Sequence, residues 1–225
     1  MRAVLDPWYA LRPCPACLAR ATTRDGVCRS CRDRWLGTPA RRGGGAVLPT
    51  APPTAPPSPP DLIALGAYRG DLGRLVRAAK YRPDRRLLAL VGTALGHRVH
   101  AALAQPPHVW LVVPVPGDRR RLRRRGLDHA LVLATGVATA LGPRAVLHPD
   151  LRRVRPTRPQ TRLSDVERRV NLEGAIEWCS GDLNGAAVVL VDDVLTTGAT
   201  ARACRAALAA AGAGRVVVAV AARAR

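Results

Sequence analysis

One stretch decides the fold: Val188-Val189-Leu190-Val191-Asp192-Asp193-Val194-Leu195-Thr196-Thr197-Gly198-Ala199-Thr200. Its first four residues are apolar and mostly β-branched, which predicts a parallel strand covered on both faces. The residues from Ala199 to Ala211 predict the following helix. The turn between strand and helix therefore lies at a helix N-terminus, directly after two carboxylates.

This turn carries groups that can hold a phosphate. Five successive backbone N–H groups can surround an anion at a helix N-terminus, and the threonine hydroxyls add donors; the five residues are Thr196, Thr197, Gly198, Ala199 and Thr200. Gly198 permits a positive φ or a close backbone approach. Asp192 and Asp193 can accept hydrogen bonds from two ribose hydroxyls. The order of groups suits a sugar phosphate, and the alternative is an ordinary strand that ends in Asp before a Thr-capped helix.

The same segment resembles the motif that binds phosphoribosyl pyrophosphate (PRPP) in type I phosphoribosyltransferases. In that motif the acidic pair meets the ribose 2′- and 3′-hydroxyls, and the Thr/Gly loop holds the 5′-phosphate. The resemblance implies that Asp192 and Asp193 are catalytic residues and that residues 196–200 bind the phosphate. It also implies that Mg²⁺ binds together with PRPP.

The charge of the chain favours anionic partners. Its 225 residues include 36 basic and 16 acidic ones, a formal net charge of +20, and Lys80 is the only lysine. Guanidinium groups match phosphate oxygens bidentately, so PRPP, pyrophosphate, nucleotides and nucleic acid are all favoured. A compositional bias would explain why the basic residues are arginines, but not why they cluster. A P-loop nucleotidase is excluded because the chain has no G-x-x-x-x-G-K-[ST] motif.

No membrane insertion is expected. The sequence has no uncharged apolar run of membrane-spanning length, and Asp6 interrupts the N-terminal hydrophobic segment. We therefore expect a cytoplasmic protein.

The N-terminal region predicts a small metal module. Four residues form a C-x2-C-x10-C-x2-C pattern: Cys14, Cys17, Cys28 and Cys31. Two such pairs can present four thiolates to one tetrahedral ion, which indicates structural zinc. Two disulfides and an iron–sulfur cluster are the alternatives. The predicted organisation is a zinc-binding module at 1–36, a Pro/Gly-rich linker at 37–60 and a phosphoribosyltransferase-like domain at 61–225.

The rest of the chain alternates strands with helices. Helices are predicted around Leu72–Ala79, Leu87–Val99 and His129–Ala140, and strands at 110–113, 145–147, 187–191 and 216–221. This alternation predicts an α/β fold with a mostly parallel, twisted sheet and helices on both faces. Ligands of such sheets bind beyond the carboxyl ends of the strands, where the loops after Val113 and Val191 emerge.

The loop after Val113 is strongly basic. Six of the seven residues from 119 to 125 are arginines. A solvated basic face is one interpretation. In type I phosphoribosyltransferases this position holds the pyrophosphate-binding loop, so the resemblance implies pyrophosphate contacts from Pro116, Gly117 and Arg119.

Further segments are similar to successive signatures of the ComF family. They are Tyr68-Arg69-Gly70 with residues 75–81, then 113–116, 124–130, 151–153, 157–163 and 168–175. The chain departs from the family pattern at Leu127-Asp128, where Phe-Asn is usual, and at Ile176, where Phe is usual. The resemblance implies a phosphoribosyltransferase-type domain that is associated in bacteria with competence and DNA uptake.

For two regions the sequence is compatible with two structural interpretations. Residues 151–178 are expected to form the hood that covers the site and recognises the acceptor, although Arg168, Arg169 and Asn171 could equally brace a hairpin. Lys80 and Tyr81 are either ligand contacts or a surface lysine beside a half-buried tyrosine.

We therefore expect a protein that binds PRPP or a related sugar phosphate with Mg²⁺ and transfers phosphoribosyl to an unidentified acceptor. The alternatives are a non-catalytic protein that binds single-stranded DNA through phosphate contacts and a PRPP-responsive regulator. In the latter case the zinc module would dock a partner such as a competence helicase.

Overall fold

The structure is a computed structural model of the whole chain. It describes residues 13–19, 26–36, 61–81, 85–103, 109–118, 122–123, 126–155, 172 and 174–224. The predicted linker at 37–60 lies outside these residues, and so do Arg119 and the segment 156–171.

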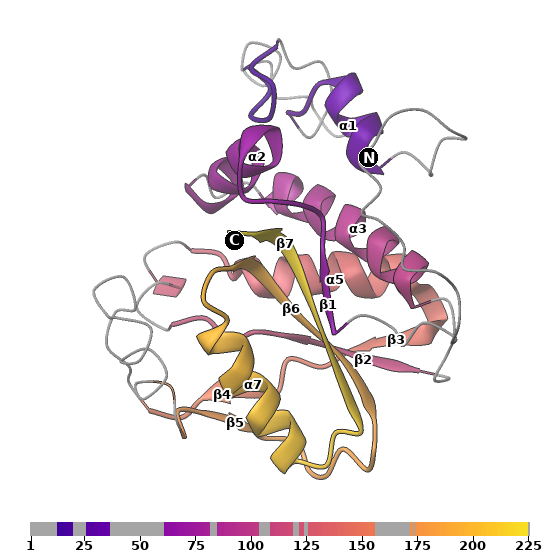
Figure 1. Cartoon of the computed structure of the whole chain (residues 1–225), viewed down its shortest axis with the longest axis vertical. Coiled ribbons are helices and arrows are strands. Elements are labelled where there is room, and N and C mark those ends of the chain that lie inside the picture. Colours follow the sequence, from indigo (N-terminus) through magenta and orange to yellow (C-terminus); the bar gives the residue numbers. More distant parts are fainter. Residues whose placement is uncertain are drawn as a thin grey trace, which may run out of the picture.

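A five-stranded parallel sheet forms the centre of the molecule (Figure 1). The strand order is β1-β7-β6-β2-β3, and the strands are β1 (Leu62–Ala64), β2 (Trp110–Pro114), β3 (Ala145–Leu147), β6 (Ala187–Leu195) and β7 (Arg215–Arg223). All four neighbouring pairs are parallel. Pro114, the last residue of β2, pairs with Val191 of β6. The loop after β2 therefore emerges beside the acidic pair.

Helices cover both faces of the sheet, as the sequence predicts (Figure 1). One face carries α2 (Gly70–Tyr81), α3 (Arg85–Ala102) and α5 (His129–Leu141), and the other carries α7 (Ala199–Ala210). Side chains alternate between the faces along β6. Val189 and Val191 join the core under α3 and α5, while Val188 and Leu190 join the core under α7.

Strand β6 is longer than the prediction of 187–191. It continues to Leu195 because β7 offers backbone partners along its whole length, pairing Asp192 with Val220 and Leu195 with Arg223. The acidic pair therefore lies inside a strand rather than in the turn that follows it. A strand is a more rigid support than a loop, so the two carboxylates are held in defined positions.

Helix α5 is held close to α3 by glycines. A Cβ at Gly136 would lie 2.6 Å from the backbone carbon of Gly92, and a Cβ at Gly92 would lie 2.8 Å from the carbonyl oxygen of Leu133. Neither position can take a larger residue without moving a helix. This packing places the N-terminus of α5, with its N-cap residue Asp128, at the edge of the sheet where β2 ends.

A second, two-stranded sheet joins β4 (Leu151–Arg153) to β5 (Ile176–Trp178) in antiparallel register. These strands are the two ends of the segment expected to form the hood. The segment between them lies almost entirely outside the described residues.

The four-cysteine segment packs on the main domain. Its helix α1 (Arg29–Leu36) begins directly after Cys28, and the buried residues Cys14, Ala16 and Val27 belong to the same apolar core as α2 and α3. Within the part of the chain that the structure describes, no helix is long and apolar enough to cross a membrane.

Candidate functional site

The acidic pair lies near the carboxyl end of β6, next to the end of β2. The backbone N–H of Asp193 donates a 2.8 Å hydrogen bond to Oδ1 of Asp192, which orients the first carboxylate. Both side chains are partly buried. Because successive residues of a strand point to opposite faces, the two carboxylates have different surroundings.

Two basic side chains approach Asp193 from the helices on one face of the sheet. Nζ of Lys80, in the last turn of α2, lies 3.1 Å from Oδ2 of Asp193. Nδ1 of His129, the first residue of α5, lies 3.9 Å from the same oxygen, which is too long for a hydrogen bond. His129 is 6% exposed, and its Nδ1 has no hydrogen-bond partner. Lys80 is 20% exposed on its side chain, whereas Tyr81 is 79% exposed rather than half-buried.

The two carboxyl groups differ in acidity. Burial and the neighbouring charge of Asp193 raise the pKa of Asp192 to about 7. Burial also raises the pKa of Asp193, but His129 and Lys80 outweigh it and hold that pKa below its ordinary value. At neutral pH the pair therefore has one charged member, Asp193, and one member, Asp192, that titrates in this range.

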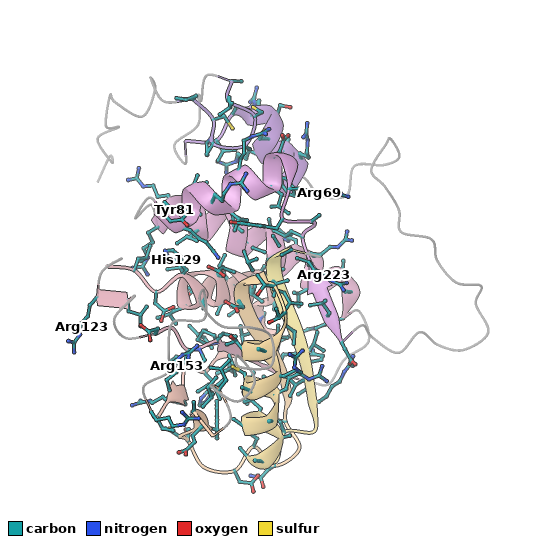
Figure 2. All side chains as sticks on the ribbon, turned by 60° about the vertical axis from the view of Figure 1, so that its left-hand side comes forward. Arg69, Tyr81, Arg123, His129, Arg153 and Arg223 are labelled. Carbon is teal, nitrogen blue, oxygen red and sulfur yellow. The ribbon has the colours of Figure 1, made fainter. Side chains whose placement is uncertain are left out.

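Arg153 of β4 connects three parts of the site. Its Nε donates a 3.0 Å hydrogen bond to the carbonyl oxygen of Pro116, and its charge lowers the pKa of Asp192. Arg153 and His129 reach the edge of the sheet from different elements (Figure 2). The loop after β2 is also tied to β6, because the N–H of Val115 donates to the carbonyl oxygen of Val191.

The turn after β6 contains one residue, Gly198, in the left-handed backbone conformation that glycine adopts without strain. Gly198 caps α7 in the left-handed region, with φ of 75°. Nη1 of Arg202 donates a 2.9 Å hydrogen bond to the carbonyl oxygen of Thr197, and the hydroxyl of Thr197 lies 3.4 Å from the N–H of Ala199. The turn from Thr196 to Thr200 is therefore at the N-terminus of a twelve-residue helix, as predicted.

A cavity of about 180 Å³ lies between the loop after β2, the N-terminus of α5 and β4. Its polar lining residues are Asp128, Arg152 and Arg153, and apolar residues from the three elements line the rest. Oδ1 of Asp128 caps α5 by accepting from the N–H of Leu131, 3.1 Å away. Because Arg153 lines the cavity and also acts on Asp192, the cavity adjoins the acidic pair.

Sequence reasoning missed His129 and Arg153 as individual site residues. His129 directly follows the helix N-cap Asp128 and lies in the segment 124–130, which is similar to a ComF signature. This position is the signal that could have identified it. Arg153 was one arginine among many. Of the predicted pyrophosphate contacts, Pro116 and Gly117 line the cavity and Pro116 accepts the hydrogen bond from Arg153, while Arg119 lies outside the described residues.

The four predicted metal ligands are brought together. The sulfur atoms of Cys14, Cys17, Cys28 and Cys31 all lie within 4.8 Å of one another. They are unbonded, and the Cys17 and Cys28 sulfurs are 3.5 Å apart. Four thiolates around tetrahedral zinc stand about 3.8 Å apart, because each lies about 2.3 Å from the ion. The cluster can therefore hold a metal ion such as zinc.

The thiols of this cluster are electrostatically unequal. Burial raises the pKa of Cys14, but hydrogen bonds from backbone N–H groups, chiefly those of Cys17 and Cys28, outweigh it and lower that pKa to about 7. Burial and the neighbouring thiols raise the pKa of Cys31 above its usual range. The remaining buried thiol, Cys204, is 0% exposed in the core under α7 and lies outside the cluster.

No protein-family model matches the chain, and no curated protein matches it.

Proposed function

We propose that this chain is a ComF-like phosphoribosyltransferase, which binds PRPP or a related ribose 5-phosphate and transfers its phosphoribosyl group to an acceptor. One observation carries the proposal. The acidic pair of β6, the glycine turn before α7 and the loop after β2 lie at the same edge of a parallel sheet. This is the edge at which parallel α/β sheets bind their ligands.

The 5-phosphate would bind at the turn from Thr196 to Thr200. The helix N-terminus supplies favourable electrostatics and backbone donors, and Gly198 has no Cβ to block close approach. Arg202 supports the turn, because its Nη1 donates a hydrogen bond to the carbonyl oxygen of Thr197.

The ribose hydroxyls would donate to Asp192 and Asp193. Asp193 is held charged by Lys80 and His129, so it is ready to accept. As the bond from C1 to the leaving oxygen breaks, positive charge develops on the ribose and negative charge on pyrophosphate. A fixed carboxylate beside the ring would offset the first of these charges without reorganising.

The pyrophosphate would bind along Pro116 and Gly117 with Arg119 of the basic loop. Mg²⁺ is coordinated by oxygen atoms, including those of carboxylates. Asp193 is already paired with Lys80, so we propose that oxygens of PRPP supply most of the Mg²⁺ coordination. Bound there, Mg²⁺ would neutralise charge on the leaving group.

The cavity beside Arg153 is our proposed acceptor site. Its apolar walls suit a flat ring, and the lining residues Asp128 and Arg152 offer an acceptor and a donor of hydrogen bonds. The small sheet β4–β5 borders the cavity and leads into the segment expected to form the hood.

The test is calorimetric titration with PRPP and Mg²⁺. The double substitution Asp192→Asn with Asp193→Asn is expected to abolish binding, because it removes both negative charges and replaces one acceptor oxygen of each carboxylate by an NH2 donor. Asp61→Asn, at an exposed position before β1, is the matched control and should bind like the unsubstituted protein. Unchanged affinity of the double variant would remove the proposal. A screen of PRPP consumption against purines, pyrimidines and DNA then identifies the acceptor.

A second function is favoured by the net charge of +20. The chain would bind single-stranded DNA through phosphate contacts and use the ribose phosphate site as a sensor. The metal module would then contact a competence helicase or another protein. Salt-dependent DNA binding that survives the double aspartate substitution, without PRPP turnover, would favour this alternative.

A further inference from the structure

Helix α2 lies between the four-cysteine module and the acidic pair. Asp71 and Arg74 lie in its first turns and face the module, while Lys80 lies in its last turn and contacts Asp193. The helix rises about 1.5 Å per residue, so the two contacts are about 9 Å apart along one rigid rod.

The module contacts the first turns of α2 through a network of hydrogen bonds and ion pairs. Nε of Arg74 donates a 2.7 Å hydrogen bond to the carbonyl oxygen of Ala16, which lies between Cys14 and Cys17 in the first cysteine pair. Nη2 of Arg74 lies 2.5 Å from Oδ1 of Asp71. Oδ2 of Asp71 in turn pairs with Arg34 of α1, 2.9 Å away. The network thus joins both halves of the module to one helix.

The other end of α2 fits closely over the acidic pair. Val76, Ala79 and Lys80 line a space of only about 10 Å³ beside Asp193 and Ala221. Val76 and Ala79 are buried, so the last turn of the helix rests on apolar side chains while Lys80 extends to the carboxylate. A displacement of the helix would therefore change the distance from Lys80 to Asp193.

We propose that Arg74 is a positioning residue, which fixes α2 on the metal-bound cysteine module and thereby holds Lys80 against Asp193. A metal ion in the cysteine cluster would order the backbone that carries the carbonyl oxygen of Ala16. Loss of the metal, or of Arg74, then loosens α2 and exposes Lys80. The consequence for ribose phosphate binding rests on the proposed function, whereas the position of Lys80 does not.

The sequence supplies its own reporter, because Lys80 is the only lysine. An amine-reactive ester labels only Lys80 and the N-terminal amine, and peptide mass spectrometry separates the two. Lys80 should be acylated slowly in the zinc-loaded full chain. Arg74→Ala should raise that rate about fivefold, the factor expected on losing one partly buried ion pair. Removal of zinc with a chelator should raise it as well.

Matched variants separate positioning from general destabilisation. Arg98→Ala removes an exposed arginine from α3. Among the described residues, its side chain makes no hydrogen bond or ion pair with the module, so this variant should leave the rate unchanged. Arg74→Lys should restore slow acylation in part, because one ammonium can still donate to Ala16. That variant introduces a second lysine, whose peptide is quantified separately. Hydrogen exchange of β6 and α5 reports whether the core is intact, and if Arg74→Ala does not fold, Asp71→Asn provides the same test.

The outcomes distinguish the two proposals. An unchanged Lys80 acylation rate in the Arg74→Ala variant overturns the positioning role, whatever the rate in the zinc-free chain. A faster rate with an intact core supports it, whether or not PRPP binds. If the zinc-loaded chain does not bind PRPP at all, the proposed function fails and the positioning role stands on the labelling.

Discussion

Nε of Arg153 lies 3.0 Å from the carbonyl oxygen of Pro116, so the small sheet β4–β5 is tied directly to the loop that follows β2. The guanidinium charge of Arg153 also acts on Asp192. One side chain therefore joins the cavity, the expected pyrophosphate loop and the acidic pair.

Arg153→Ala is expected to weaken PRPP binding by about tenfold, because a charge-assisted hydrogen bond that fixes the loop is lost. The pKa of Asp192 should rise further, since a nearby positive charge is removed. Calorimetry measures the first effect, and the pH dependence of thermal unfolding measures the second. Arg144→Ala, at an exposed position before β3, is the control and should change neither. Equal affinity of the two variants would contradict this role.

Asp192→Asn is expected to stabilise the protein at pH 8. The pKa of Asp192 is about 7 in the folded chain and about 3.9 in an unfolded one, so the folded state binds the proton more tightly between these values. Stability therefore falls as the pH rises from about 4 to about 7. Asn carries no charge, so the melting temperature should rise by about 3–6 °C at pH 8 and little at pH 4.5.

Asp193→Asn is expected to have the opposite effect and is the natural comparison. The pKa of Asp193 is lower in the folded chain than in the unfolded one, so its charged carboxylate stabilises the fold above about pH 4. This stabilisation is lost only as the pH falls from about 4 through the pKa of the folded chain. At neutral pH the substitution leaves Lys80 without its carboxylate and should lower the melting temperature. Thermal unfolding of both variants from pH 4 to pH 8 tests the pair, and parallel curves would refute the assignment.

Gly198→Ala is expected to weaken ribose phosphate binding as well as stability. An alanine at φ of 75° costs about 1 kcal/mol, and its Cβ would lie 3.2 Å from Nη1 of Arg202. Gly185→Ala is the matched control, because Gly185 has φ of 77° in the turn before β6, at the other end of the strand. Both variants should lose similar stability, but only Gly198→Ala should lose affinity in calorimetry.

The cysteine cluster is expected to bind one zinc ion per chain. Cys31→Ser should abolish that zinc and lower the melting temperature, because the module shares its core with α2 and α3. Cys179→Ser is the control, since Cys179 is exposed and lies outside the cluster. Elemental analysis by mass spectrometry measures the metal. Zinc retained at one equivalent in Cys31→Ser would mean that the cluster is not the site.

The long elements could be predicted from the sequence because each buries a periodic set of apolar residues. Predicted helices at 129–140 and 199–211 correspond to α5 and α7 within one residue. The three-residue strands β1, β4 and β5 were not predicted, because so few residues show no period, whereas the equally short β3 corresponds to the predicted strand at 145–147. The predicted end of β6 was too early because pairing with β7 keeps charged residues in a strand.

What the sequence by itself determined is the local order of groups: the apolar run, the acidic pair, the glycine turn and the paired cysteines. Each is a property of neighbouring residues, and backbone geometry translates it directly into structure. Only the tertiary structure decided which distant side chains meet them. Lys80, His129 and Arg153 reach the acidic pair because α2, α5 and β4 are packed around one edge of the sheet. That convergence depends on helix packing across the whole core, which no local pattern encodes.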